Sequence, residues 1–182
     1  MINIEYEYKV MVSKENFNKL KNNFINKKHE KYIQTNYYYD TKDLLLKKSK
    51  LSLRIRYIEN KNEYLLTLKE PFENVRKEYE AYLKELSFND IPDEIKEILK
   101  KYNIQPQELI LLGSLKTTRL EYSINSSLIC LDYNQYNHKE DYEIECESNS
   151  LENAKKVLIN ILNENGISYS VSSLSKMARA LK

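Results

Sequence analysis

Polar and apolar side chains alternate strictly over the first ten residues of the chain, 1–10. This period of two is typical of a β-strand, whose successive side chains point to opposite faces of a sheet. One face carries apolar and aromatic side chains, and the other carries Glu5, Glu7 and Lys9. Taken alone, the segment is compatible with an ordinary half-buried strand whose charged face meets solvent. The other segments of the chain must decide between that interpretation and a functional one.

Further segments show a similar alternation and predict additional strands. They span residues 31–39, 51–58, 63–69, 76–83, 109–116, 118–124, 128–133 and 141–147. The segments 60–62 and 125–127 are predicted turns, and Pro71 is predicted to end a strand. Roughly eight strands joined mostly by short turns favour an antiparallel sheet that closes or folds over.

Between these strands the pattern changes to a helical period. Ser13 is the predicted N-cap of a first helix, with Phe17, Leu20, Phe24 and Ile25 on its apolar side. A short helical turn is predicted over 44–46, after a cap at Asp40-Thr41. A longer helix is predicted from Asn89 or Asp90 to Tyr102, and its apolar stripe consists of Ile91, Ile95, Ile98 and Leu99. The last two predicted helices span 151–163, stopping near Gly166, and 172–179, which is short and capped. The three helices with an apolar stripe, those that begin near Ser13, Asn89 and Leu151, are suited to covering the apolar face of a sheet.

Composition narrows the class of protein. The chain has 182 residues, and we predict a single domain over 1–182. Its 29 basic and 27 acidic residues balance, which argues against a nucleic-acid-binding polyelectrolyte. With only 2 glycines, a glycine-rich phosphate loop is not expected, so side chains must hold any phosphate. Neither a membrane span nor a signal peptide is expected, and we predict a cytoplasmic protein with reduced Cys130 and Cys146.

The charged faces of the predicted strands are unusual in composition. They carry Glu-x-Glu, Arg-x-Arg, Arg-x-Glu-x-Glu and Glu-x-Glu-x-Glu runs at 5–7, 54–56, 76–80 and 143–147. If the apolar faces met in a sandwich, these charges would lie in solvent. If helices cover the apolar faces instead, the charges face inward, where arginine pairs suit phosphate and carboxylate pairs suit Mg²⁺ or Mn²⁺. The repetition of like charges favours this second arrangement, whose chemistry is that of a polyphosphate site.

Several segments also resemble, in order, the conserved blocks of a known family. Residues 5–9, Glu-Tyr-Glu-Tyr-Lys, resemble the Glu-x-Glu-x-Lys signature of the CYTH superfamily, the triphosphate tunnel metalloenzymes. The other matching blocks are 38–41, 51–56, 66–69, 76–80, Arg119, Asp132, 143–147 and 175–179. The resemblance spans nearly the whole chain. It implies an α+β fold in the form of a closed eight-stranded antiparallel β-tunnel, or barrel, with a charged lumen and helices packed on the outside.

The resemblance implies roles for individual residues. The implied metal ligands are Glu5, Glu7, Asp132 and two of Glu143, Glu145 and Glu147. The implied substrate-binding residues are Lys9, Arg54, Arg56, Lys69, Arg76, Arg119, Lys176 and Arg179, of which the last two share a helix face. Three acids alternate where the family motif requires two, so the choice among Glu143, Glu145 and Glu147 is open.

The leading hypothesis is a metal-dependent hydrolase that uses Mg²⁺ or Mn²⁺ to cleave the terminal phosphoanhydride of a triphosphate, either inorganic tripolyphosphate or an organic triphosphate. Glu5, Glu7 and Lys9 are its candidate catalytic residues, and Lys9 is a candidate for deprotonating the attacking water. The alternatives are a non-catalytic polyphosphate or nucleotide binder and a class IV-type adenylyl cyclase. The expected partner is a small molecule containing a triphosphate, with no nucleic acid and no membrane, and the expected state is a monomer or homodimer.

Some predictions concern single side chains. Tyr6 and Tyr8 are expected to pack outward beneath a helix while Glu5 and Glu7 point into the tunnel. The remaining expectations are surface positions for His29 and His138, a packed apolar position for Cys146, a position on the face of Asp132 for Cys130, and a tunnel-lining position for Tyr37 or Tyr39.

Overall fold

A computed structural model describes residues 2–73, 75–171 and 174–182 of the chain. The predicted positions Met1, Ser172 and Ser173 lie outside the described residues. The fold is α+β, and it divides into two compact units. Unit 1 comprises Met1–Glu5, Gln34–Leu115 and Leu181, and unit 2 comprises Tyr6–Ile33, Lys116–Ala180 and Lys182. The single domain stays a prediction.

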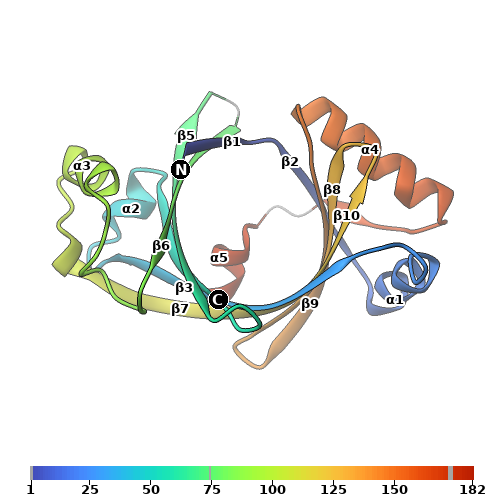
Figure 1. Ribbon diagram of the computed structural model, residues 1–182, viewed down its shortest axis with the longest axis horizontal. Coiled ribbons are helices and arrows are strands. Elements are labelled where there is room, and N and C mark those ends of the chain that lie inside the picture. Colours follow the sequence, from blue (N-terminus) through green and yellow to red (C-terminus); the bar gives the residue numbers. More distant parts are fainter. Residues whose placement is uncertain (1, 74, 172–173) are drawn as a thin grey trace. The chain divides into compact units, whose positions relative to one another are not determined.

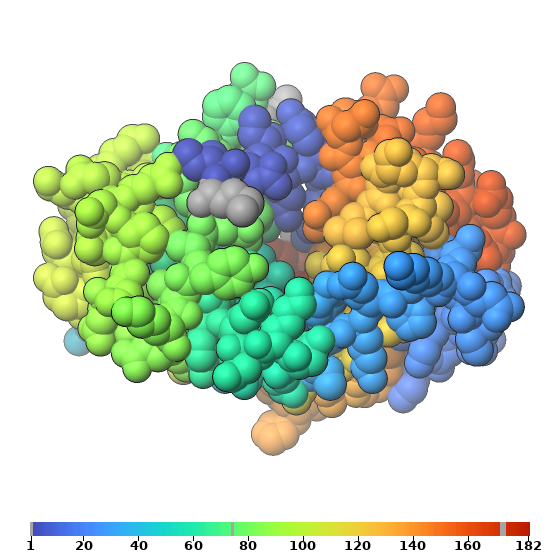
Figure 2. All heavy atoms as spheres, in the orientation of Figure 1, coloured from blue at the N-terminus to red at the C-terminus, as the bar shows by residue number. Residues whose placement is uncertain are grey.

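Unit 1 is built from antiparallel strands and two short α-helices (Figure 1). Its strands are β1 (Ile2–Glu5), β4 (Ser52–Ile58), β5 (Glu63–Phe72), β6 (Val75–Leu83) and most of β3 (Glu30–Thr41), paired in the order β1-β6-β5-β4-β3. Its helical elements are α2 (Leu45–Lys48), α3 (Asp93–Lys101) and the 3-10 turn η1 (Pro106–Glu108). Side chains of β6 and α3, green and yellow-green in Figure 2, form much of its visible surface.

The helices of unit 1 cover the apolar face of its strands. The Asp40 carboxylate caps α2 by accepting hydrogen bonds from the backbone N–H groups of Leu46, at 2.8 Å, and Lys47, at 3.0 Å. The predicted cap is therefore confirmed. The buried cluster contains, among others, Leu46, Leu53, Ile55, Leu66, Leu68, Ile91, Ile95 and Leu99. Each such side chain contributes about 1.5 to 3 kcal/mol when it is fully buried.

Unit 2 repeats this plan with its own strands and helices. Its strands are β2 (Glu7–Val12), β8 (Ser127–Tyr136), β9 (Lys139–Glu147), β10 (Ser170–Val171) and part of β7 (Leu109–Ile124), paired antiparallel in the order β7-β8-β9-β2-β10. Its helices are α1 (Lys14–Asn23), α4 (Leu151–Glu164) and α5 (Lys176–Ala180). Both β3 and β7 contribute residues to both units, and the complete strand order is β1-β6-β5-β4-β3-β7-β8-β9-β2-β10.

Serine caps begin the two longer helices of unit 2. The Ser13 hydroxyl accepts a hydrogen bond from the Asn16 backbone N–H at 3.2 Å, and the Ser150 hydroxyl accepts one from the Asn153 N–H at 3.1 Å. Such caps are typically worth about 1 kcal/mol. The two helices cover the apolar face of β2, β8 and β9 (Figure 1). Their buried side chains include Phe17, Leu20, Phe24, Ala154, Leu158, Ile161 and Leu162.

In each unit the charged face of the strands is opposite the helices that cover the apolar face, which are α2 and α3 in unit 1 and α1 and α4 in unit 2. Helix α5 instead contacts the charged face through Lys176 and Arg179. The interpretation as ordinary solvated strands is wrong for the most acidic of them, because Asp132 and Glu143 are 0% exposed and Glu145 is 2% exposed. Tyr8 packs against the core of unit 2, and Lys155 Nζ of α4 lies 5.7 Å from the centroid of its ring. The predicted position of Tyr8 beneath a helix is therefore confirmed.

The first predicted strand is in fact two. Tyr6 separates β1 from β2, because the chain changes partners there: β1 pairs with β6, whereas β2 pairs with β9. The Tyr6 carbonyl accepts a hydrogen bond from the Ser148 N–H at 3.1 Å. Both strands keep the alternation, so a period of two alone could not reveal the change of partner.

Two other strand limits differ from the prediction. Pro71 does not end β5, which continues to Phe72 opposite Val75. Proline is tolerated there because β4 pairs with β5 only as far as Lys69, which leaves β6 as the neighbour. The predicted strands 109–116 and 118–124 are one continuous strand, β7, whose Thr117 pairs with Asn134.

The remaining differences are small. Ile25 is 71% exposed because α1 ends at Asn23 and its C-cap, Phe24, leaves the helical conformation. The short strand β10 was not predicted. Among the residues that the structure describes, no helix combines the length and apolar character needed to cross a membrane.

Candidate functional site

Unit 1 gathers three predicted basic residues on its charged face. Arg54 and Arg56 come from β4, and Lys69 comes from β5. The register places Arg54 opposite Thr67 of β5, and Lys69 opposite Glu78 of β6. Since cross-strand partners share a face, these side chains lie on one surface.

Lys69 connects the basic residues of unit 1 to its acidic residues. Its Nζ donates a hydrogen bond to Glu5 Oε2 at 2.7 Å and forms an ion pair with Glu78. The Lys69 side chain is 20% exposed and that of Glu5 is 14% exposed. The predicted ligand Glu5 therefore lies against a predicted phosphate-binding cation.

The three arginines predicted in unit 1 differ in environment. Arg56 Nε donates a hydrogen bond to Asn36 Oδ1 at 3.0 Å. Arg54 Nε is buried and has no hydrogen-bond partner within residues 2–73, 75–171 and 174–182. Arg76 is exposed, and its Nη1 donates to the Lys50 carbonyl at 2.5 Å. Arg54 therefore has the clearest unfilled capacity to bind an anion.

Unit 2 brings together predicted residues from β7, β8, β9 and α5. Arg119 binds Asp132 bidentately, through Nε at 2.8 Å and Nη2 at 2.7 Å, and Nη2 also contacts Glu145. Lys176 Nζ lies 2.8 Å from Asp132 Oδ2 and 3.5 Å from Glu143 Oε2, and it also contacts Glu145. These buried groups form one ion-pair network.

Lys9 joins this network from β2. Its Nζ donates to Glu7 Oε1 at 2.5 Å and lies 3.9 Å from carboxylate oxygens of Glu143 and Glu145. Burial would lower the pKa of Lys9, but the neighbouring carboxylates, Glu7 first, raise it above its usual value. Lys9 is therefore a protonated cation at neutral pH and is poorly suited to deprotonating water.

Arg179 holds α5 against β9. Its Nε lies 3.0 Å from Asp141 Oδ2, its Nη2 contacts Glu143, and its Nη1 donates to the Leu174 carbonyl at 3.2 Å. Asp141 also accepts a hydrogen bond from the Tyr136 hydroxyl at 2.7 Å. The predicted contact of Arg179 with substrate stays a prediction. Asp141 was missed, although it has the same period-two position as Glu143.

Counted over these contacts among the described residues, the ion-pair network of unit 2 contains more carboxylates than cations. Its four cations are Lys9, Arg119, Lys176 and Arg179, and its five carboxylates are Glu7, Asp132, Asp141, Glu143 and Glu145. Burial would raise the pKa of Asp132 and of Glu145, but the charges of Arg119 and Lys176 hold both pKa values below their usual range. Burial, together with the negative charge of Glu145, raises the pKa of Glu143 to about 7 despite the opposing charges of Lys176, Lys9 and Arg179.

This raised pKa predicts a pH dependence of stability. Between the usual pKa of 4.5 and the folded value of about 7, the folded state binds a proton that the unfolded state releases. Stability should therefore fall by about 3 kcal/mol as the pH rises through this window. Asp132 and Glu145 have lowered pKa values, so their protonation reduces stability only at a pH below this window. Urea unfolding of the metal-free protein at pH 5 and pH 8 measures the difference.

Two variants control for other titrating groups. Glu143→Gln should remove most of the pH dependence of stability, because the glutamine side chain does not titrate. Glu164→Gln, at the exposed end of α4, should keep it. An unchanged pH dependence in Glu143→Gln would show that Glu143 titrates normally in the folded protein.

Carboxylates suited to a metal ion lie beside this network in unit 2. Glu7 of β2 is opposite Glu147 of β9, and oxygens of the two approach within 4.8 Å. Glu145, Glu147 and the Cys130 sulfur also lie within 4.8 Å of one another. Burial raises the pKa of the Cys130 thiol well above its usual value, so it is protonated. These acidic residues can hold a metal ion through oxygen ligands.

Several predictions for single residues can now be assessed. Tyr39 is part of the core of unit 1 and Tyr37 packs against it, so neither faces the charged surface. That prediction was wrong because Tyr38, not its neighbours, is opposite Arg54. Cys146 is buried in the core of unit 2, as predicted. The predicted surface positions of His29 and His138 are confirmed by their exposure.

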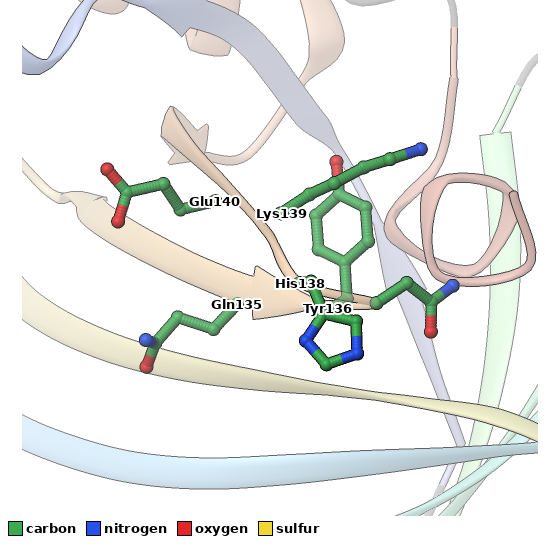
Figure 3. A pocket seen from close by; sticks show the side chains of 6 residues that line it. Gln135, Tyr136, His138, Lys139 and Glu140 are labelled. Carbon is green, nitrogen blue, oxygen red and sulfur yellow. The ribbon is translucent and has the colours of Figure 1, made fainter.

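A pocket at the tip of the β8–β9 hairpin is lined by none of the predicted substrate-binding or metal-binding residues. Figure 3 shows the side chains that line it, including those of Gln135, His138, Lys139 and Glu140. They come from one continuous segment, and none was predicted as a site residue. Within that segment, Tyr136 is linked to the network through its hydrogen bond to Asp141.

Comparison with known proteins identifies the same family that the conserved blocks of the sequence resemble. The family model described as the CYTH domain matches residues 3–181. This chain belongs to the CYTH family. The predicted family membership is thus confirmed over almost the entire length of the chain. A curated member, YjbK of Bacillus subtilis, is named a candidate triphosphatase; it is 36% identical over 149 residues, covering 80% of this chain and 77% of YjbK.

Solved CYTH-like structures show a similar fold. A candidate adenylate cyclase from Bacillus halodurans is 33% identical, with a TM-score of 0.88 over 100% of this chain and 99% of that one. A protein from Hippeastrum, a candidate adenylyl cyclase described as revealing a dominant triphosphatase activity, is 26% identical, with a TM-score of 0.77 over 97% and 94% of the two chains. This CYTH chain thus shares its fold with proteins named for two activities.

Proposed function

We propose that this CYTH protein is a metal-dependent hydrolase that cleaves the terminal phosphoanhydride of a triphosphate, with inorganic tripolyphosphate as the preferred substrate. The observation that carries the proposal is the buried combination of arginine and lysine side chains with closely spaced carboxylates. Such a set gathers phosphate oxygens and a divalent cation at one surface, which is most of what phosphoryl transfer requires. The names of YjbK and of the Hippeastrum protein support the same activity.

Phosphate binding is assigned to basic residues of both charged faces. In unit 1 these are Arg54, Arg56 and Lys69, with Arg76 at the exposed end of β6. In unit 2 they are Lys9, Arg119, Lys176 and Arg179. We further propose that both faces line the closed eight-stranded tunnel that the sequence predicts.

The acidic residues fit a hard divalent cation such as Mg²⁺ or Mn²⁺. In unit 2, Glu7, Glu145 and Glu147 would hold it, since all three offer carboxylate oxygens. We propose Glu5 of unit 1 as a further metal ligand on the basis of its residue type. Asp132 and Glu143 are better suited to orienting Arg119, Lys176 and Arg179, which they contact directly. When bound, the metal would neutralise phosphate charge and lower the pKa of a coordinated water.

The side chains of the protein then have distinct tasks. Arg119 and Lys176 are held in fixed positions by Asp132, so they meet the incoming phosphate with little reorganisation. Lys9 is protonated, so it stabilises charge that develops on the phosphoryl oxygens. Burial of these groups strengthens each of these electrostatic interactions.

The proposal predicts phosphate release that depends on metal. We expect turnover of tripolyphosphate with Mg²⁺ or Mn²⁺ and none with excess chelator, because the carboxylate set is then empty of its cation. Parallel assays with thiamine triphosphate and ATP rank the organic substrates. Absence of metal-dependent release from all three would refute the hydrolase assignment and leave a non-catalytic binder or an adenylyl cyclase.

A second candidate activity comes from the name of the Bacillus halodurans relative, a candidate adenylate cyclase. Cyclisation of ATP releases pyrophosphate, whereas terminal hydrolysis releases orthophosphate. Measuring both products and cyclic AMP from ATP distinguishes the two activities. Cyclic AMP as the main product would replace the hydrolase assignment.

A further inference from the structure

A row of polar side chains crosses the charged face of unit 2 beside the paired Arg119 and Asp132. The register pairs Thr117 of β7 with Asn134 of β8, and Asn134 with Asp141 of β9. Cross-strand partners share a face, and Arg119 and Asp132 are two positions along the same strands, so the two rows are neighbours. None of the three side chains of this row was predicted as a site residue.

Hydrogen bonds connect this row from end to end. The Thr117 hydroxyl donates to Asn134 Oδ1 at 2.7 Å, and Asn134 Nδ2 donates to Asp141 Oδ1 at 2.9 Å. Both ends of the asparagine amide thus have a partner of matching chemistry. The other oxygen of Asp141, Oδ2, accepts a hydrogen bond from the Tyr136 hydroxyl at 2.7 Å. Donors on β8 therefore fix both oxygens of the Asp141 carboxylate.

Burial separates this row from any bound substrate. Thr117 and Asn134 are 0% exposed, so they present no surface to a ligand. The Asp141 side chain is 15% exposed. Hydrogen bonds that are shielded from water are electrostatically stronger than exposed ones. Thr117 and Asn134 can therefore affect a reaction only through the side chains that they hold in place.

Arg179 of α5 contacts the far end of the row. Its Nε lies 3.0 Å from Asp141 Oδ2, and its Nη1 donates to the Leu174 carbonyl at 3.2 Å, just before α5 begins. The guanidinium thus connects β9 to the start of the helix that carries Lys176. The position of Lys176, a proposed phosphate-binding residue, therefore depends on the orientation of Asp141.

We propose that Asn134 and Asp141 are positioning residues that fix Arg179, and through it Lys176, at the proposed phosphate-binding site. This inference rests on the proposed function and deepens it. A guanidinium whose carboxylate partner can rotate has several orientations, whereas a partner held at both oxygens leaves one. A cation that is already in place stabilises the charge of the transition state without reorienting at the moment of reaction.

Steady-state kinetics with tripolyphosphate and Mg²⁺ test this role. Asn134→Leu removes both hydrogen bonds of the amide and keeps the branched shape of the side chain. We expect kcat to fall about tenfold and KM to change less than about threefold, because the other phosphate-binding residues still hold the substrate. Gln135→Leu is the matched control, since Gln135 is exposed on the opposite face of the same strand, and it should keep the wild-type kcat.

A double-substitution cycle with Arg179→Met determines whether the effect of Asn134 passes through the guanidinium. If it does, Asn134→Leu should change kcat less than about twofold when Arg179 is already replaced. An undiminished tenfold loss in that background would overturn the inference, because Asn134 would then act without Arg179. A purely structural role of the row would give this second result.

Hydrogen exchange of the backbone amides of α5 tests the positioning without any turnover. We expect Asn134→Leu to raise the exchange rates of residues 176–180 about tenfold, and Gln135→Leu to leave them unchanged. Equal acceleration throughout unit 2 would show a general loss of stability and would overturn the inference. If Asn134→Leu fails to fold, Tyr136→Phe removes one donor to Asp141 and should give about threefold effects on kcat and exchange.

The outcomes distinguish this inference from the proposed function. Wild-type kcat and wild-type exchange of α5 in Asn134→Leu would overturn the inference and leave the hydrolase assignment standing. Faster exchange confined to α5, without phosphate release by the wild-type protein, would support the positioning of Arg179 and Lys176 and overturn the hydrolase. Wild-type exchange of α5 together with an inactive wild-type protein would overturn both.

Discussion

Glu147→Gln should lower kcat for tripolyphosphate about a thousandfold, because it removes one carboxylate from the pair that approaches within 4.8 Å on β2 and β9. Glutamine keeps the size and polarity of the side chain but not its charge, so it binds a divalent cation far less well. Tripolyphosphate binding in chelator should change little, since the proposed phosphate-binding residues are untouched. Phosphate release and Mn²⁺ titration measure the two effects.

The control for this substitution is Glu164→Gln, which changes the same side chain at an exposed position of α4. It should retain the kcat and the metal affinity of the wild-type protein. Comparison with Glu143→Gln tests which of the acids Glu143 and Glu147 binds the metal, a choice that the sequence left open. A large loss of metal affinity in Glu143→Gln with near-normal affinity in Glu147→Gln would refute the metal assignment given above.

Lys176→Met should lower the free energy of unfolding by about 3 to 5 kcal/mol at neutral pH. Lys176 lies against the buried carboxylates of Asp132, Glu143 and Glu145. Methionine fills a similar volume but leaves these acids with three cations in their network instead of four. The dominant effect is thus an uncompensated buried charge, which exceeds the cost of lost packing. Urea unfolding monitored by circular dichroism measures the loss.

Lys156→Met is the matched control, because Lys156 lies on the exposed side of α4. We expect it to change the free energy of unfolding by less than about 0.5 kcal/mol. The loss in Lys176→Met should also shrink at low pH, where protonation removes the excess negative charge. Equal effects of the two substitutions would mean that the network tolerates the missing cation by relaxation or water entry.

Alternation in the sequence was sufficient to predict most strands and to place the charges on one face. It succeeded for β4, whose apolar face is buried and whose charged face is half-buried, and for β9, where both faces are buried from Tyr142 to Cys146. Alternation could not identify which strands pair with one another, since a single sequence does not show which strands are neighbours in an antiparallel sheet. The division at Tyr6 and the continuity of β7 through Thr117 both depend on pairing. Closure into an eight-stranded tunnel stays a prediction.

The candidate site was predictable as a set of residue types and less so as a set of contacts. Glu143, Glu145 and Glu147 have the same period-two position, and only the register with β2 brings Glu147 beside Glu7. The choice of Tyr37 or Tyr39 over Tyr38 failed because residues 34–41 are all polar or aromatic, so this segment shows no alternation that identifies its buried face. Asn36 was missed because a lone buried amide carries no charge pattern.

The strict separation of faces in β9 makes its length intolerant of change. Its odd-numbered residues Asp141, Glu143 and Glu145 belong to the ion-pair network, whereas Tyr142, Ile144 and Cys146 belong to the core. Deletion of one residue within the strand would exchange the two sets, moving carboxylates beneath α1 and α4 and apolar side chains against Arg119 and Lys176. Natural length variation in this part of the chain should therefore be confined to the exposed turn at Asn137 and His138.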